Sequence, residues 1–247
     1  MSRTLTIARR EFTSLFYLPV AYLVLFLFLL YMGILFGMFI FYPGAPSELR
    51  GVIDFSRFGL FIIVPLMTMS FFADEYSSGR IEMLRTSPIT EFQLVLGKFI
   101  GASLFYLVLV ASTLIYVGLL AIYGHPDWLQ TAASYLGLIL MGCMFVSIGL
   151  FFSACTQNQF VAATASILTL GVFSIISELS TRLWGEISIF NWFSIPLRAP
   201  LYYLGVGPHI ADFSKGVVDT SHLAYFLVFT GLFLFLTYLL LESKKWR

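Results

Sequence analysis

Few residues of the chain have the type and spacing that catalysis needs. Gly97-Lys98 is similar to the end of a phosphate-binding P-loop. However, Phe99 stands where Ser or Thr must bind magnesium, and Phe92 replaces the first glycine. The Gly-x-Ser-x-Gly pattern of serine hydrolases does not occur in the sequence. We therefore expect a non-catalytic chain with no cofactor of its own.

The residue types that bind metals are scattered. His125, His209 and His222 lie far apart in the sequence without ligand spacing, and we interpret them as surface or interfacial residues. Cys143 and Cys155 show neither metal-ligand spacing nor a disulfide framework. Free cysteines usually behave as small apolar residues, which suits a position in a helix. The sequence predicts no metal site.

The scarcity of charge indicates the class of protein. Only 11% of the residues are charged and 59% are hydrophobic, whereas ordinary soluble chains carry about 25% charged residues. This composition excludes a disordered chain and a disulfide scaffold, and it argues strongly against a soluble enzyme. The formal net charge of +1 indicates no nucleic-acid partner. We predict an all-α polytopic membrane protein.

Apolar segments suggest six transmembrane helices, each needing about 20 mostly apolar residues. The predicted spans are 18–42, 58–73, 94–123, 131–154, 160–177 and 223–241. The second is short and contains Pro65, so a re-entrant segment is the alternative there. The apolar centres of the six spans contain no charged residue, although proton and ion relays usually place such groups inside the membrane. This argues against an ion-coupled carrier.

The distribution of Lys and Arg predicts the orientation. With the N-terminus inside, nine lie on the cytoplasmic side and five on the opposite side, which favours two cytoplasmic termini. The cytoplasmic set is Arg3, Arg9, Arg10, Arg80, Arg85, Lys98, Lys244, Lys245 and Arg247, and the opposite set is Arg50, Arg57, Arg182, Arg198 and Lys215.

The segments outside the spans are small. Residues 1–17 are predicted to form an amphipathic interfacial helix whose apolar stripe is Leu5, Ala8, Phe12, Leu15 and Phe16. The alternative is an extension of the first span. Residues 43–57 are expected to form a short loop. The non-cytoplasmic segment 178–222 contains several Pro and Gly residues, so we expect broken or re-entrant helices there.

Residues 74–91 form the most informative loop. They predict a short helix bounded by Gly79 and by Ser87-Pro88, followed by a capping box of Thr90 and Gln93 before the third span. The charged residues expected to face water are Asp74, Glu75, Glu82 and Arg85. Such an element suits contact with a cytoplasmic partner, and the alternative is a solvated charged turn.

This loop resembles the first cytoplasmic loop of the ABC type-2 permease family, in which a Glu precedes a Gly, a second Glu and a Leu, then a Pro and a Gly-Lys. The matching residues are Glu75, Gly79, Glu82, Leu84, Pro88, Gly97 and Lys98. Arg80 departs from the small hydroxyl residue usual after that glycine. Further similar stretches are Arg10-Glu11-Phe12, residues 153–163 with Asn158-Gln159, and Lys245-Trp246-Arg247. Within the family, the chain is most similar to gliding-motility permeases, and next to the nitrous-oxide-reductase maturation permease.

The resemblance implies a single transmembrane domain, 1–247, acting as the permease subunit of an ATP-driven exporter in the bacterial inner membrane. Its partners would be two cytoplasmic ATPase subunits, which bind ATP and magnesium, a second permease copy or close relative, membrane lipid, and an envelope accessory protein. The implied ATPase-coupling interface is Glu75, Gly79, Arg80, Glu82, Leu84, Arg85 and Pro88, with a second cytoplasmic loop at Gln157, Asn158 and Gln159.

Two questions stay open at this point. A scaffold for mechanical work on an envelope complex, moving no solute, is the alternative function, and an ion-coupled carrier is a weaker one. The pairs Gly33/Gly37 and Gly97/Gly101 have the spacing that lets helices approach closely. The contact is expected within one chain, with contact between subunits as the alternative.

Overall fold

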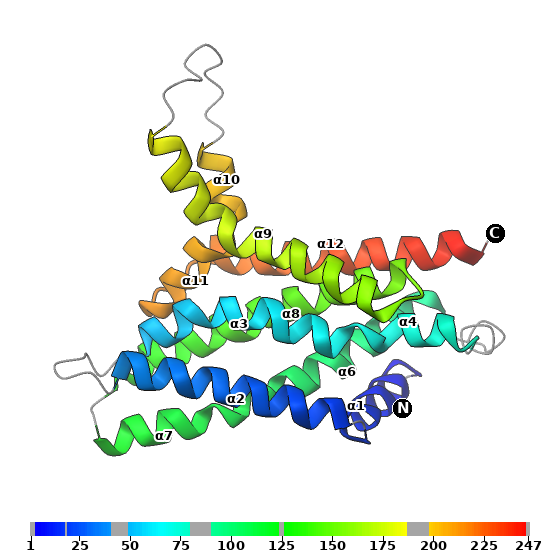
Figure 1. The fold of residues 1–247 in the computed structure, drawn as a ribbon, viewed down its shortest axis with the longest axis horizontal. Helices are drawn as coiled ribbons and strands as arrows, with labels where there is room; N and C mark the ends of the chain where they lie inside the picture. Colours follow the sequence, from blue (N-terminus) through cyan, green and yellow to red (C-terminus); the bar gives the residue numbers. More distant parts are fainter. Residues whose placement is uncertain are drawn as a thin grey trace, which may run out of the picture.

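The described part of the chain consists of helices and their connections. The computed structural model describes residues 3–17, 19–40, 49–79, 90–123, 126–186 and 198–245, and within these ranges it contains no β-strand. Figure 1 shows α1 (Arg3–Tyr17) and the C-terminal end of α12 (Thr220–Lys245) at the same end of the helix bundle. We call this the termini end. The other end, where α11 (Val206–Ser214) lies, is called the α11 end.

The prediction of six spans is confirmed, because six stretches are long and apolar enough to cross a membrane. They belong to α2 (Pro19–Ile40), α3 with α4 (Arg50–Thr68 and Ser70–Ser77), α6 with α7 (Glu91–Ser112 and Leu114–Tyr123), α8 (Trp128–Cys155), α9 (Gln159–Glu186) and α12. Most of these helices run side by side in Figure 1.

The predicted start of the second span is wrong. The sequence predicted a span over 58–73 after a loop, but the helical stretch runs from Arg50 to Ser77 over 28 residues. Val52 and Ile53 are buried in the bundle, and the Ser56 hydroxyl donates to the Ile53 carbonyl at 2.6 Å, so this polar-looking turn is helical. A helix of this length is sufficient to span a bilayer without turning back.

A serine of α8 stabilises the junction between α3 and α4. The two helices meet at Met69, whose own N–H still donates to the Pro65 carbonyl at 2.9 Å. The Ser153 Oγ donates to the Met69 carbonyl at 2.9 Å and accepts from the backbone N–H groups of Phe72 and Ala73 at 3.0 and 3.2 Å. Because an unsatisfied backbone group costs several kcal/mol in an apolar medium, this side chain fixes where α4 begins against α8.

α1 is a helix separate from α2, and it lies along α6. The two glycines of the predicted small-residue pair on α6 face it. A Cβ on Gly97 would come within 2.7 Å of Ile7, and one on Gly101 within 2.9 Å of the Ala8 carbonyl oxygen. A side chain at either position would therefore push the two helices apart. The glycines place α1 close enough for polar contacts with the bundle.

The apolar face predicted for α1 is partly wrong. Leu5 is 52% exposed, whereas α1 buries Ile7, Ala8, Glu11 and Leu15. These positions follow the i, i+4 spacing of one helix face. The face includes a glutamate because Glu11 has a cationic partner in the bundle, which an apolar periodicity does not reveal.

The α11 end is built from short helices, as predicted for 178–222. α9 continues to Glu186, and α10 (Arg198–Leu204) and α11 follow. Gly205 separates these two helices, and a Cβ there would lie 2.6 Å from the Cβ of Ser177. The chain therefore approaches α9 closely at this point.

Replacing Gly101 by Val should destabilise the protein by about 1–3 kcal/mol, because the added side chain overpacks the contact between α1 and α6. The matched control is Gly37→Val in α2, where an added Cβ meets no atom within 4 Å. Thermal unfolding in detergent should show a lower midpoint for Gly101→Val than for the control. Equal midpoints would contradict the proposed close contact.

Candidate coupling site

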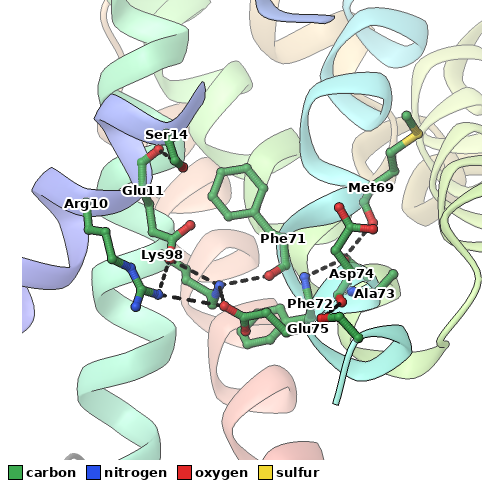
Figure 2. A network of polar contacts seen from close by, with 12 residues as sticks. Arg10, Glu11, Ser14, Met69, Phe71, Phe72, Ala73, Asp74, Glu75 and Lys98 are labelled. Carbon is green, nitrogen blue, oxygen red and sulfur yellow. Dashed lines mark hydrogen bonds and ion pairs between the residues drawn. The ribbon is translucent and has the colours of Figure 1, made fainter. Parts of the chain in front are cut away.

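A buried lysine organises the termini end. Lys98 of α6 is only 1% exposed, yet its ammonium has three acceptors (Figure 2). The Nζ atom lies 2.8 Å from Glu75 Oε1 of α4, 2.8 Å from the Phe71 carbonyl oxygen and 3.3 Å from Glu11 Oε1 of α1. A lysine ammonium has three donors, so all of its hydrogen-bonding capacity is used within the protein.

Arg10 brings the cluster to charge balance. Its Nη2 atom lies 2.7 Å from Glu11 Oε1 and 3.7 Å from Glu75 Oε1, so two cations face two carboxylates (Figure 2). Partial burial lowers the pKa of Arg10, but the hydrogen bond that Arg10 donates to Glu11 and the charges of Glu11 and Glu75 outweigh it and raise that pKa above its usual value. We call Arg10, Glu11, Glu75 and Lys98 the charge quartet.

The expectation that Glu75 faces water is wrong. Glu75 is 8% exposed and pairs with Lys98 inside the bundle. Removing one partner of a buried pair leaves an uncompensated charge, whereas an exposed pair contributes little. The side chain of Glu75 therefore fixes the position of α4 from within and does not present a charge at the surface.

α4 also contacts the ends of three other helices. Ser153 of α8 binds its first turn, and the Gln159 side-chain amide of α9 donates to the Asp74 carboxylate. Lys244 of α12 lies 4.1 Å from the centre of the Tyr76 ring and donates to the Ala154 carbonyl at 2.8 Å. With the charge quartet, these contacts join α4 to α1, α6, α8, α9 and α12.

The end of α4 leads directly into the predicted coupling segment. Gly79 follows the helix with φ +69°, a conformation that glycine adopts without strain. The Ser78 N–H donates to the Asp74 carbonyl at 3.0 Å and closes the last turn. Of the predicted interface, Glu75 and Gly79 are described, whereas Arg80, Glu82, Leu84, Arg85 and Pro88 lie outside the described residues.

The second predicted loop is a three-residue connection, Thr156–Asn158, before α9. Gln157 and Asn158 are exposed, and the Asn158 side chain accepts from the Phe160 N–H at 2.9 Å, as an N-cap does. Gln159 begins α9 and reaches Asp74 of α4. The structure thus joins this loop to the entrance of the first one, a contact that the sequence did not indicate.

The capping box predicted before the third span is present. The Thr90 side chain accepts from the Gln93 N–H at 3.3 Å, and the Gln93 side chain accepts from the Thr90 N–H at 3.4 Å. Residues 80–89, which lie outside the described residues, are therefore bounded by a glycine-terminated helix on one side and a capped helix start on the other.

Residues 50–241 match the family described as ABC-2 family transporter protein. This match covers more than half of the chain. The chain belongs to the ABC-2 transporter family. It is accordingly a membrane permease subunit of an ABC transporter, a non-catalytic subunit of a family that works with a separate ATPase subunit. No curated protein sequence matches the chain.

Sequence reasoning missed the internal pairing of this permease. It identified Arg10, Glu11, Glu75 and Lys98 as separate motif or loop residues, and it did not connect them. The available signal was Lys98 itself, because a lysine next to a long apolar run needs a partner, and the nearest motifs offered two glutamates. The contacts of Ser153 and Lys244 had no comparable signal.

The α11 end of the permease contains a second polar cluster. Arg57 belongs to the predicted loop 43–57, but it lies within α3 with 8% exposure and pairs with Glu178 of α9. A cavity of about 380 Å³ lies beside this pair. Its lining residues are Asp54, Phe55, Arg57, Ser177, Glu178, Tyr202, Gly207, Pro208 and Ala211.

The histidines were interpreted as surface or interfacial residues without a shared site, but two of them are in contact and one of these is buried. His209 is 5% exposed, and its Nδ1 lies 2.6 Å from the Nδ1 of His222. His125 lies outside the described residues. Within the described ranges no group of three His, Cys, Asp or Glu side chains is arranged to hold a metal ion. The two imidazoles therefore form a pair.

Substituting Lys98 by Met should destabilise the permease by about 3–5 kcal/mol, because two buried carboxylates would lose their shared cation. Adding Glu75→Gln to Lys98→Met should recover part of that loss, since one of the uncompensated charges disappears. Chemical unfolding of the single and double variants in detergent measures this coupling.

An exposed ion pair provides the control for this experiment. Lys215 pairs with Asp212 at 2.8 Å, with side chains 44% and 36% exposed. Lys215→Met should therefore change the free energy of unfolding by less than about 1 kcal/mol. A double variant no more stable than Lys98→Met alone would show that the quartet does not act as one electrostatic unit.

Proposed function

We propose that this permease is one membrane half of an ATP-driven exporter, and that the segment after α4 docks on a separate cytoplasmic ATPase. The contact set of α4 carries this proposal. The helix that enters the segment is joined to α1 and α6 by the charge quartet, to α8 by Ser153, to α9 by Gln159 and to the end of α12 by Lys244.

This arrangement suits mechanical coupling. The apolar centres of the spans contain no charged side chain within the described residues, so they offer no proton or ion relay. A displacement of residues 80–89 would act first on α4, and α4 would pass it to five other helices through short polar contacts. In this proposal ATP and magnesium bind the partner ATPase, whose motion this chain receives.

The residues of the interface take two roles in the proposal. Arg80, Glu82, Leu84 and Arg85 contact the ATPase directly, and Pro88 ends that contact before the capped start of α6. Glu75 is a positioning residue, because its carboxylate is held by Lys98. Gly79 provides the turn between the two parts.

The proposal also covers the orientation of the permease in the membrane and its partner subunits. The termini end faces the cytoplasm of a bacterial inner membrane, as the excess of Lys and Arg at that end favours. Two permease halves, identical or closely related, join two ATPase subunits. The finer resemblance to gliding-motility permeases is consistent with an envelope accessory partner.

Replacing residues 80–88 with a Gly/Ser segment of equal length should abolish co-purification with a co-expressed ABC ATPase encoded beside this chain. Membrane insertion and the thermal unfolding midpoint should stay unchanged, because the bonded part of α4 ends before the segment. The matched control replaces residues 43–48, which precede α3 in the sequence. A loop-replaced chain that retains the ATPase would place the coupling contact elsewhere. A wild-type chain that retains none would refute the coupling proposal itself.

Single substitutions should distinguish residues that contact the ATPase from residues that position α4. Glu82→Lys should reduce ATPase retention at least tenfold with unchanged thermal stability. Glu75→Gln should instead lower the unfolding midpoint, with loss of ATPase retention only in proportion to loss of folded protein. Quantitative co-purification and thermal unfolding of the same samples test both expectations. A stable Glu75→Gln variant that has lost the ATPase would contradict the positioning role.

A further inference from the structure

Two imidazoles at the α11 end are linked into one hydrogen-bonded chain. His209 Nε2 lies 2.9 Å from the Tyr203 carbonyl oxygen of α10, and His222 Nε2 lies 2.9 Å from Asp212 Oδ2. Between them, the two Nδ1 atoms are 2.6 Å apart. The chain therefore runs from a backbone carbonyl, through both rings, to a carboxylate.

The chemistry of the two ends determines how many protons the pair holds. A carbonyl oxygen only accepts, so His209 Nε2 carries a proton, and the ionised Asp212 also only accepts, so His222 Nε2 carries another. A hydrogen bond between the two Nδ1 atoms needs one proton, not none or two. The pair holds three protons on four nitrogens, and its net charge is +1.

Asp212 is suited to accept the last hydrogen bond of this series, because its carboxylate is ionised. A hydrogen bond from Lys215 lowers the pKa of Asp212 below its usual range, and contact with His222 adds to the effect. The carboxylate is therefore ionised at neutral pH. Lys215 Nζ binds Oδ1 while His222 binds Oδ2, so each cation has its own oxygen.

We propose that His209 and His222 form a single-proton binding site that latches α11 to α10 and α12. The latch is closed when one proton is shared between the two Nδ1 atoms. Loss of that proton leaves two lone pairs facing each other at 2.6 Å. Gain of one more places two N–H groups and two positive charges at the same distance, so the contact opens in both directions.

Burial of His209 makes the latch less stable at low pH. Burial lowers the pKa of His209 below its usual value, against the opposing effect of the Tyr203 carbonyl. A histidine with a lowered pKa in the folded state binds fewer protons than in the unfolded state. Folding is therefore weakened as the pH falls below the ordinary histidine pKa of about 6.5.

The charges near the pair come from several elements. Asp212 and Lys215 belong to α11 and its end, and Asp219 precedes α12 close enough to feel the charge of His222. Asp54 and Arg57 of α3 and Glu178 of α9 line the cavity to which α11 also contributes residues. α8, which also contacts α11, has no charged residue. Among these charged groups, Asp212 is the one bonded to an imidazole.

Opening of the latch would change the cavity of about 380 Å³, because α11 supplies Gly207, Pro208 and Ala211 to its wall. His209 also stacks on the Tyr225 ring of α12 at 3.9 Å between centroids, and the Tyr225 hydroxyl donates to the Leu204 carbonyl at 2.7 Å. Proton binding thus controls how α10 and α11 sit on α12 and on that cavity.

Nitrogen NMR of the ¹⁵N-histidine-labelled permease, solubilised in detergent between pH 4.5 and 9, tests the site; these pH limits are about two units either side of the ordinary histidine value. The chain has 3 histidines, so assignment needs only single-site variants. His209 and His222 should change together, with an intermediate state in which both Nε2 atoms are protonated. Thermal unfolding midpoints should trace a bell over the same range. Two independent single-proton titrations would overturn the proposal.

Two conservative variants should shift the bell-shaped pH dependence of the unfolding midpoint in opposite directions. Asp212→Asn keeps an acceptor but removes the carboxylate charge, so the shared proton should be lost at lower pH than in the wild type. Lys215→Gln removes the cation that competes for Asp212, so the proton should be held to higher pH. Asp127→Asn, which preserves the cap of α8, is the control and should leave the bell in place. Shifts in the same direction, or no shift, would refute the shared-proton site.

Discussion

The ammonium of Lys98 is the constraint on which the termini end depends. A lysine in an apolar bundle is tolerated only when its charge is balanced and its donors are bonded. That requirement brings Glu75 of α4 and Glu11 of α1 to the same point on α6, and Arg10 restores neutrality. Gly97 and Gly101 allow the approach, because any side chain there would hold α1 too far away for Glu11 to reach. The charge pattern and the small-residue pattern therefore act as one structural device.

The position of α4 follows from this device and from Ser153. One end of α4 is fixed by a hydroxyl that bonds to backbone groups at its junction with α3, and its carboxylate Glu75 is held by Lys98. A helix held at both points moves as a rigid unit with the bundle. The segment that follows, in contrast, begins at a glycine with positive φ, where the bonded helix ends. A bonded helix up to Gly79, followed by a glycine turn, suits the coupling role that is proposed for the segment after it.

The sequence predicted what is local or averaged over many residues. The six apolar spans, the capping box at Thr90 and the short helices of 178–222 depend on composition and near-neighbour spacing. The missed features are contacts between residues far apart in sequence, such as Glu11 with Lys98 and His209 with His222. The early start of α3 was missed for the same reason, because Val52 and Ile53 become helical core only once the bundle surrounds them. Hydrophobic periodicity left Glu11 out of the buried face of α1, because it registers apolar side chains and not an ionic partner on α6.

The charged groups of the described bundle are concentrated at its two ends, and this separation shapes what each end can do. The charge quartet is neutral and closely bonded, so a proton gained or lost there would leave a buried charge unpaired; such a cluster suits transmission of force. The histidine pair carries one positive charge and one shared proton, so the hydrogen bond between its rings depends on pH. Between them the span centres are free of charge within the described residues. In the proposed coupling mechanism, a proton bound at the α11 end would act by changing how easily α11 and α12 follow a displacement that starts at α4.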